Sequence, residues 1–165
     1  MTDKKMMKAA MKDSISEVLE TMFFLPLDFP SAGDSDEQSR LSDTDKTITA
    51  KLEFRGSLAG CFVLSIPEAS ALSMTADFLG VDTSHITEEQ TNETVKEIIN
   101  MIAGSTFRNY NAQLVFDLGI PEVVHLDEIW KSGAGNQEEI LALFNTLEDQ
   151  LALKMVWSEG PGPSN

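Results

Sequence analysis

Residues 87–110 read TEEQTNETVKEIINMIAGSTFRNY, and this stretch decides the fold. Thr87 followed three residues later by Gln90 has the pattern of a capping box, which predicts the first turn of a helix. Apolar residues then recur at helical spacing, at Val95, Ile98, Ile99, Ile102 and Phe107. The stretch therefore predicts one long amphipathic helix that ends near Tyr110.

The other side of this helix is polar, and it contains two residues that weaken helices. It is formed by Glu93, Lys96, Glu97, Asn100, Gly104 and Arg108. Asn is a poor helix former, and Gly costs about 1 kcal/mol relative to Ala in a helix interior. Because Glu97 and Asn100 are three residues apart, their side chains lie on one face. A carboxylate and a carboxamide together, with Gly104 one turn later, indicate a face on which a partner docks.

The rest of the chain predicts two units that each combine a helix with a β-hairpin. Periodicity and turn residues place helices at 3–24, 67–79 and 87–110, and strands at 47–54, 57–66, 139–147 and 151–157. The stretch 114–129 is looser and is expected to supply an edge strand. This order predicts an α+β layer protein: two helix-plus-hairpin repeats with their long helices packed on an antiparallel sheet.

The two long helices also match each other at a fixed offset. Glu17-Val-Leu-Glu20-Thr-Met-Phe-Phe24 aligns with Glu97-Ile-Ile-Asn100-Met-Ile-Ala-Gly104. Where the second copy has Asn100 and Gly104, the first has Glu20 and Phe24. If one helix carries a surface site, the second helix is the candidate.

Composition limits the classes of partner. The chain has 12 Lys and Arg against 27 Asp and Glu, a formal net charge of −15. Such a chain is repelled by phosphate backbones and anionic lipid surfaces, so we expect neither nucleic acid nor membrane as a partner. The single Cys61 cannot form an internal disulfide, which fits a reducing compartment, and its apolar strand predicts a small core residue. No run approaches the ~20 apolar residues of a membrane span. We expect a cytoplasmic protein.

The length of 165 residues suits one domain with its own core. We expect that domain to span 1–159. Residues 31–46 hold five acidic residues without periodicity and are expected to form a mobile loop. The Gly, Pro and Ser-rich residues 160–165 are expected to be a disordered tail. Neither His residue has other potential metal ligands near it at the spacing of a metal site, so no metal site is expected.

These motifs resemble a known family. Glu97-x-x-Asn100-x-x-x-Gly104, followed by Gly119-Ile-Pro121-Glu-Val-Val, is similar to the signature of the CheC/CheX/FliY chemotaxis phosphatases, with the CheX branch most similar. The resemblance extends over residues 13–157, because the order of helices and hairpins also agrees. CheC-type members usually carry the motif in both halves and CheX-type members carry one, as this chain does. The fold that the resemblance implies is CheC-like.

The resemblance implies hydrolysis of the aspartyl phosphate on a CheY-like response regulator. Asn100 would orient the attacking water, and Glu97 would anchor the partner by pairing with a lysine beside its phosphorylation site. The further candidates for partner contact are Glu93, Lys96, Gly104 and Arg108. No cofactor of its own is implied, because the partner would hold the phosphoryl group and its Mg²⁺.

Two alternatives stay open. A non-catalytic interaction module, like the flagellar switch components of the same fold family, would bind partners without hydrolysis, but it would not require Asn100 with Glu97. A CheC-like protein regulated by the deamidase CheD is the second, and the lone motif argues against it. The resemblance also implies a homodimer that joins two sheets edge to edge, which would cover exposed backbone groups.

Overall fold

The computed structural model describes residues 3–29, 46–124, 137–146 and 149–159. The helices in these ranges are α1 (Lys4–Phe23), α2 (Glu68–Leu79) and α3 (Glu88–Tyr110), with a 3₁₀ turn, η2, at Thr83–His85. The strands are β1 (Thr47–Gly56), β2 (Leu58–Pro67), β3 (Phe116–Leu118), β4 (Glu122–Val124), β5 (Glu138–Asn145) and β6 (Gln150–Glu159). The element order agrees with the predicted order of helices and hairpins.

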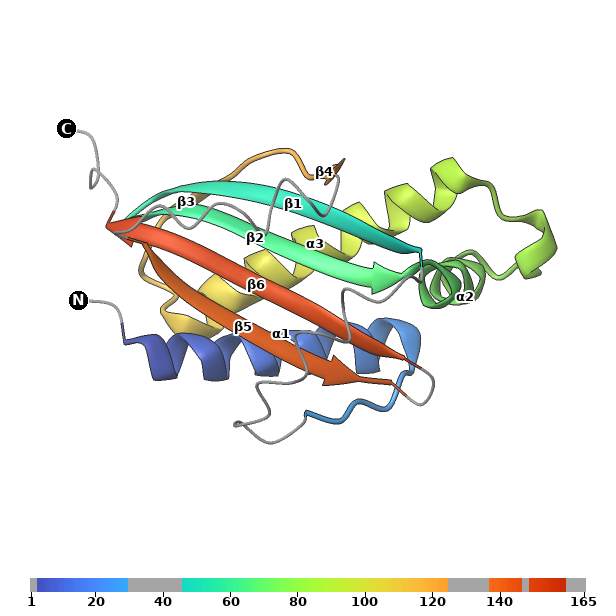
Figure 1. Ribbon diagram of the computed structural model, residues 1–165. Helices are drawn as coiled ribbons and strands as arrows, with labels where there is room; N and C mark the ends of the chain where they lie inside the picture. The colour runs from blue at the N-terminus through green and yellow to red at the C-terminus, as the bar shows by residue number, and fades with distance from the viewer. Residues whose placement is uncertain (1–2, 30–45, 125–136, 147–148, 160–165) are drawn as a thin grey trace.

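All strands of the sheet pair antiparallel, in the order β3-β1-β2-β6-β5, and β4 also pairs with β1. Figure 1 shows α1 and α3 together behind this sheet and α2 at the end where β2 finishes. The hairpins β1–β2 and β5–β6 meet through the central strands β2 and β6. The predicted α+β fold, two helix-plus-hairpin repeats with long helices on an antiparallel sheet, is confirmed.

The core lies between the helices and one face of the sheet. Alternate strand residues such as Leu52, Phe54, Phe62 and Trp157 are buried on that face. They meet the apolar stripe of α3, of which Val95, Ile98, Ile99, Ile102 and Phe107 are all buried. Because burial of this stripe fixes the rotation of α3 about its axis, the opposite side of the helix must face outward.

The helices α1 and α3 lie side by side and run in opposite directions. The Asn109 side chain donates to Ser14 Oγ at 3.0 Å, and Ser105 Oγ donates to the Glu17 carboxylate at 3.1 Å. The order of buried, half-buried and exposed positions is the same in residues 11–19 and 91–99. The two helices therefore share their burial pattern over these nine positions, and the patterns differ from residues 20 and 100 onward.

One expectation was wrong, and several others concern residues that lie outside the described ranges. Cys61 is half-buried on the sheet face away from the helices and is not part of the core. Strand β2 is apolar on both faces, so alternation did not identify the inner one. The expected acidic loop at 31–46, apart from Lys46, the tail at 160–165 and residues 125–129 of the expected edge strand all lie outside the described residues.

Candidate functional site on helix α3

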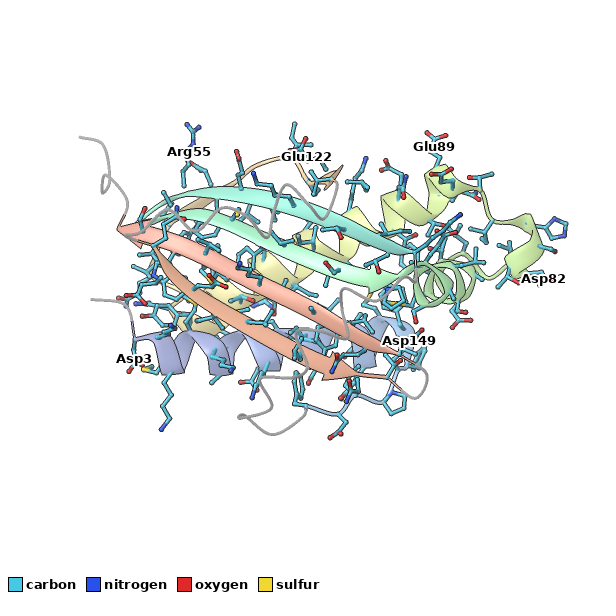
Figure 2. All side chains as sticks on the ribbon, in the orientation of Figure 1. Asp3, Arg55, Asp82, Glu89, Glu122 and Asp149 are labelled. Carbon is cyan, nitrogen blue, oxygen red and sulfur yellow. The ribbon has the colours of Figure 1, made fainter. Side chains whose placement is uncertain are left out.

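Helix α3 is well fixed at its start. Gln90 N–H donates to Thr87 Oγ1 at 3.1 Å, and Thr87 N–H donates to Gln90 Oε1 at 2.9 Å, which completes the predicted capping box. Glu88 and Glu89 occupy the first turn, where negative charge favours the helix dipole. Figure 2 shows Glu89 at this end of the helix, beyond the edge of the sheet. The outward face of α3 is thus presented by a capped helix whose other side is held in the core.

Glu97 and Asn100 lie on that outward face. Glu97 is exposed and Asn100 is half-buried, one turn apart. Within the described part of the chain, neither side chain has a hydrogen-bond or ion-pair partner. A carboxylate and a carboxamide are therefore both available to a second molecule.

Gly104, one turn after Asn100, borders open space. A Cβ built at this residue would meet nothing within 4 Å. The glycine is therefore not needed for helix packing inside the described protein, although packing is the ordinary reason for a glycine in a buried helix. What the missing side chain leaves is bare backbone on the same face as Asn100.

The remaining candidates on α3 are engaged in surface ion pairs. Lys96 Nζ lies 2.8 Å from Glu93, and Arg108 lies 3.3 Å from Glu17 of α1. These pairs are solvent-exposed, so each contributes little to stability and its members can exchange partners. The Arg108–Glu17 pair also shows that α1 and α3 expose their polar faces on the same side of the molecule.

A cavity of about 230 Å³ lies beside the last two turns of α3, from Gly104 toward the end of the helix. It is lined by Phe107 and Arg108 of α3 and by Phe116 and Leu118 of β3, among others. The rings of Phe107 and Phe116 stack with centroids 3.7 Å apart, which fixes β3 against α3. Sequence reasoning missed this hollow, whose lining also includes the polar residues Arg108 and Asn111; the only signal for it was the alternation of Leu114, Phe116 and Leu118.

The comparison with known families identifies the family to which this fold belongs. The family model described as Chemotaxis phosphatase CheX matches residues 48–145, more than half of the chain. The chain belongs to the CheX family. The matched range contains all of α3, and the resemblance inferred from the sequence motif is confirmed.

Solved structures of CheX and its relatives share the fold. CheX from Vibrio vulnificus is 20% identical, with a TM-score of 0.70 over 92% of this chain and 96% of that chain. CheX from Borrelia burgdorferi, solved in complex with CheY, BeF3 and Mg²⁺, is 19% identical, with a TM-score of 0.66 over 92% and 97% of the two chains. FliY from Thermotoga maritima is 13% identical, with a TM-score of 0.57 over 94% and 90%. A comparison with curated proteins finds no match.

Neither a metal site nor a membrane-spanning helix is found among the described residues. No group of three or more His, Cys, Asp or Glu side chains in the described ranges is arranged to hold a metal ion. Among the helices of the same ranges, none combines the length and the apolar character needed to cross a bilayer.

Proposed function

We propose that this CheX-family chain is a phosphatase that hydrolyses the aspartyl phosphate of a CheY-like response regulator. The observation that carries the proposal is the outward face of α3, where Glu97 and Asn100 have no partner within the described residues. Family membership supports the reaction class, and the Borrelia burgdorferi relative was solved with CheY. The roles of individual residues follow from their chemistry and placement.

Asn100 orients the attacking water. Its carboxamide has both an acceptor oxygen and a donor NH₂, so it can hold a water in line with the phosphorus while staying neutral. A carboxylate at the same place would repel the negatively charged phosphoryl group. Asn100 is half-buried, and its helix is held by the buried residues Ile99 and Ile102 on either side of it in the chain. The position of Asn100 is therefore defined before the partner binds.

Glu97 anchors the partner. Its exposed carboxylate, one turn before Asn100, is placed to accept a charge-assisted hydrogen bond from a lysine beside the phosphorylation site. Glu93 and Lys96 lie within about one turn of Glu97, and Arg108 lies about three turns further along the same helix; all three contribute to recognition by charge, while Gly104 admits the partner's backbone to close range.

The reaction needs no covalent step on this chain. Water attacks the phosphorus, the bond between phosphorus and the aspartyl oxygen breaks, and the regulator regains its carboxylate as inorganic phosphate leaves. The water proton passes to a phosphate oxygen or to solvent, since Asn100 cannot accept it. Mg²⁺ is expected on the partner, where it neutralises phosphoryl charge.

The test measures loss of ³²P from the phosphorylated CheY-like regulators of the source organism. We expect wild-type protein to accelerate the loss and Asn100→Ala to reduce that acceleration by about 10²-fold, the usual scale for removing one positioned polar group from an active site. Asn92→Ala is the matched control, because it makes the same change at another half-buried position of α3. Failure of the wild-type protein to accelerate any regulator would refute the proposal and favour a non-catalytic interaction module.

A further inference from the structure

The segment from β3 to β4 contains a β-bulge beside the outward face of α3. In the pairing with β1, Leu118 lies opposite Phe54 and Glu122 lies opposite Lys51. Three steps along β1 therefore correspond to four along this segment, so one extra residue is inserted between β3 and β4. Bulges of this kind occur at sheet edges and re-aim a side chain.

Gly119 allows the bulge to form. Its N–H donates to the Glu53 carbonyl oxygen at 2.7 Å, and a Cβ at this residue would come within 3.1 Å of the same oxygen. The next residue, Ile120, is pushed away from the ladder and is 90% exposed. An isoleucine at that exposure gains nothing from the fold of its own chain.

The bulge lies level with Asn100. Phe116 stacks on Phe107, and Leu118 lines the same cavity as Gly104, so β3 and α3 run past each other in opposite directions. Two more strand residues advance about 6.6 Å, which is about four residues of an α-helix. A step of this length along the segment leads from Leu118 to Ile120. The same step along α3, toward its start, leads from Gly104 to Asn100. Figure 1 shows this segment following the outer edge of β1 while α3 crosses behind the sheet toward the same edge.

Val123, three residues after Ile120, is an apolar residue on the helix side of the sheet. Val123 lies opposite Ala50, whose side chain is buried against the helices, so Val123 points to that side and remains 38% exposed. Charged residues of the segment point to the other side of the sheet; Glu122, for example, lies opposite Lys51. Figure 2 shows Glu122 and Arg55 projecting along this outer edge. Two exposed apolar residues, Ile120 and Val123, thus lie in the edge segment beside the polar face of α3.

We infer that Ile120, with Val123 behind it, is a second contact for the response regulator that docks on α3. The inference rests on the proposed function and names a determinant of binding at the same face. The partner's lysine meets Glu97, and an apolar side chain next to its phosphorylation site meets Ile120 and the mouth of the cavity at Gly104. Charge pairs at an exposed rim give orientation more than affinity, and an apolar contact adds affinity by removing apolar surface from water.

The experiment compares wild-type protein, Ile120→Ser and Val115→Ser. Val115 is 75% exposed and lies five residues earlier, roughly 16 Å away along the strand, so it controls for the loss of an exposed apolar side chain. Each variant is titrated with the CheY-like regulators of the source organism loaded with BeF3 and Mg²⁺, and the decay of the ³²P-labelled regulator is followed at saturating and at low concentration.

We expect Ile120→Ser to weaken binding about tenfold or more and to raise KM while kcat stays at the wild-type value. Ile120→Leu should restore binding, and Val115→Ser should match wild type. Equal affinity of wild type and Ile120→Ser would overturn the inference. So would a loss of dimer mass in Ile120→Ser, because Ile120 would then be a contact between copies of this chain. Binding without hydrolysis by the wild-type protein would refute the proposed function alone.

Discussion

Replacing Gly104 should make the protein more stable and less active. The position is inside α3, and a Cβ there meets nothing within 4 Å, so Gly104→Ala gains helix propensity without any clash. The gain is about 1 kcal/mol, which corresponds to a rise in melting temperature of about 2–4 °C for a chain of this size. Gly104→Phe copies the residue at the equivalent position of the first repeat, and Phe is also a better helix former than Gly.

Activity should change in the opposite direction. If the regulator's backbone packs against the bare Cα of Gly104, an added methyl group displaces the phosphoryl group from Asn100. A displacement of about 1 Å can reduce the rate by as much as 10²-fold, so we expect kcat/KM to fall about tenfold or more for Gly104→Ala and further for Gly104→Phe.

Calorimetry and the ³²P decay assay measure the two effects on the same samples. Ala9→Gly is the control, because Ala9 is exposed in α1 and its loss should lower stability by about 1 kcal/mol without affecting activity. Full activity of Gly104→Phe would refute the idea that a partner approaches this face closely. A lower melting temperature for Gly104→Ala would show that the space over residue 104 is not open.

Three other predictions concern Glu97, Cys61 and the oligomeric state. Glu97→Gln should weaken binding of the BeF3-loaded regulator about tenfold and reduce the salt dependence of binding, while turnover at saturation persists; equal losses of affinity and turnover would contradict an anchoring role. Burial raises the pKa of the Cys61 thiol, so at pH 8 iodoacetamide should react more slowly with the folded protein than with protein unfolded in urea, and equal rates would contradict that environment. Light scattering at micromolar concentration should give twice the chain mass of 18.1 kDa, and the monomer mass would exclude the predicted homodimer.

The elements of the fold could be predicted because their signals are local. The Thr87–Gln90 capping box and the apolar stripe of α3 are set by neighbouring residues, and both were found where the sequence put them. The outward position of Glu97 and Asn100 follows from the same periodicity, since burial of the stripe leaves them no other side.

The environment of that face could not be predicted, because it depends on pairing between distant segments. The bulge at Ile120 exists only relative to β1, more than sixty residues earlier in the chain. The Arg108–Glu17 pair likewise requires that α1 and α3 pack side by side. Cys61 was misplaced for a related reason, since a strand with apolar residues on both faces does not reveal which of them face the helices.

The repeat explains why one helix carries the candidate site and the other does not. In α3 the helix continues for six residues beyond Gly104, so Asn100 is held inside a continuous helix. In α1 the helix ends at Phe23, and Phe24, the counterpart of Gly104, is a left-handed cap residue with φ 54° and 85% exposure. Glu20, the counterpart of Asn100, is therefore in the last turn and carries a negative charge that would repel a phosphoryl group. Exchanging Glu20 for Asn alone would leave the bulky Phe24 where a partner's backbone must approach. The two helices share their burial pattern over 11–19 and 91–99, and their difference in chemistry comes from two side chains and from where each helix ends.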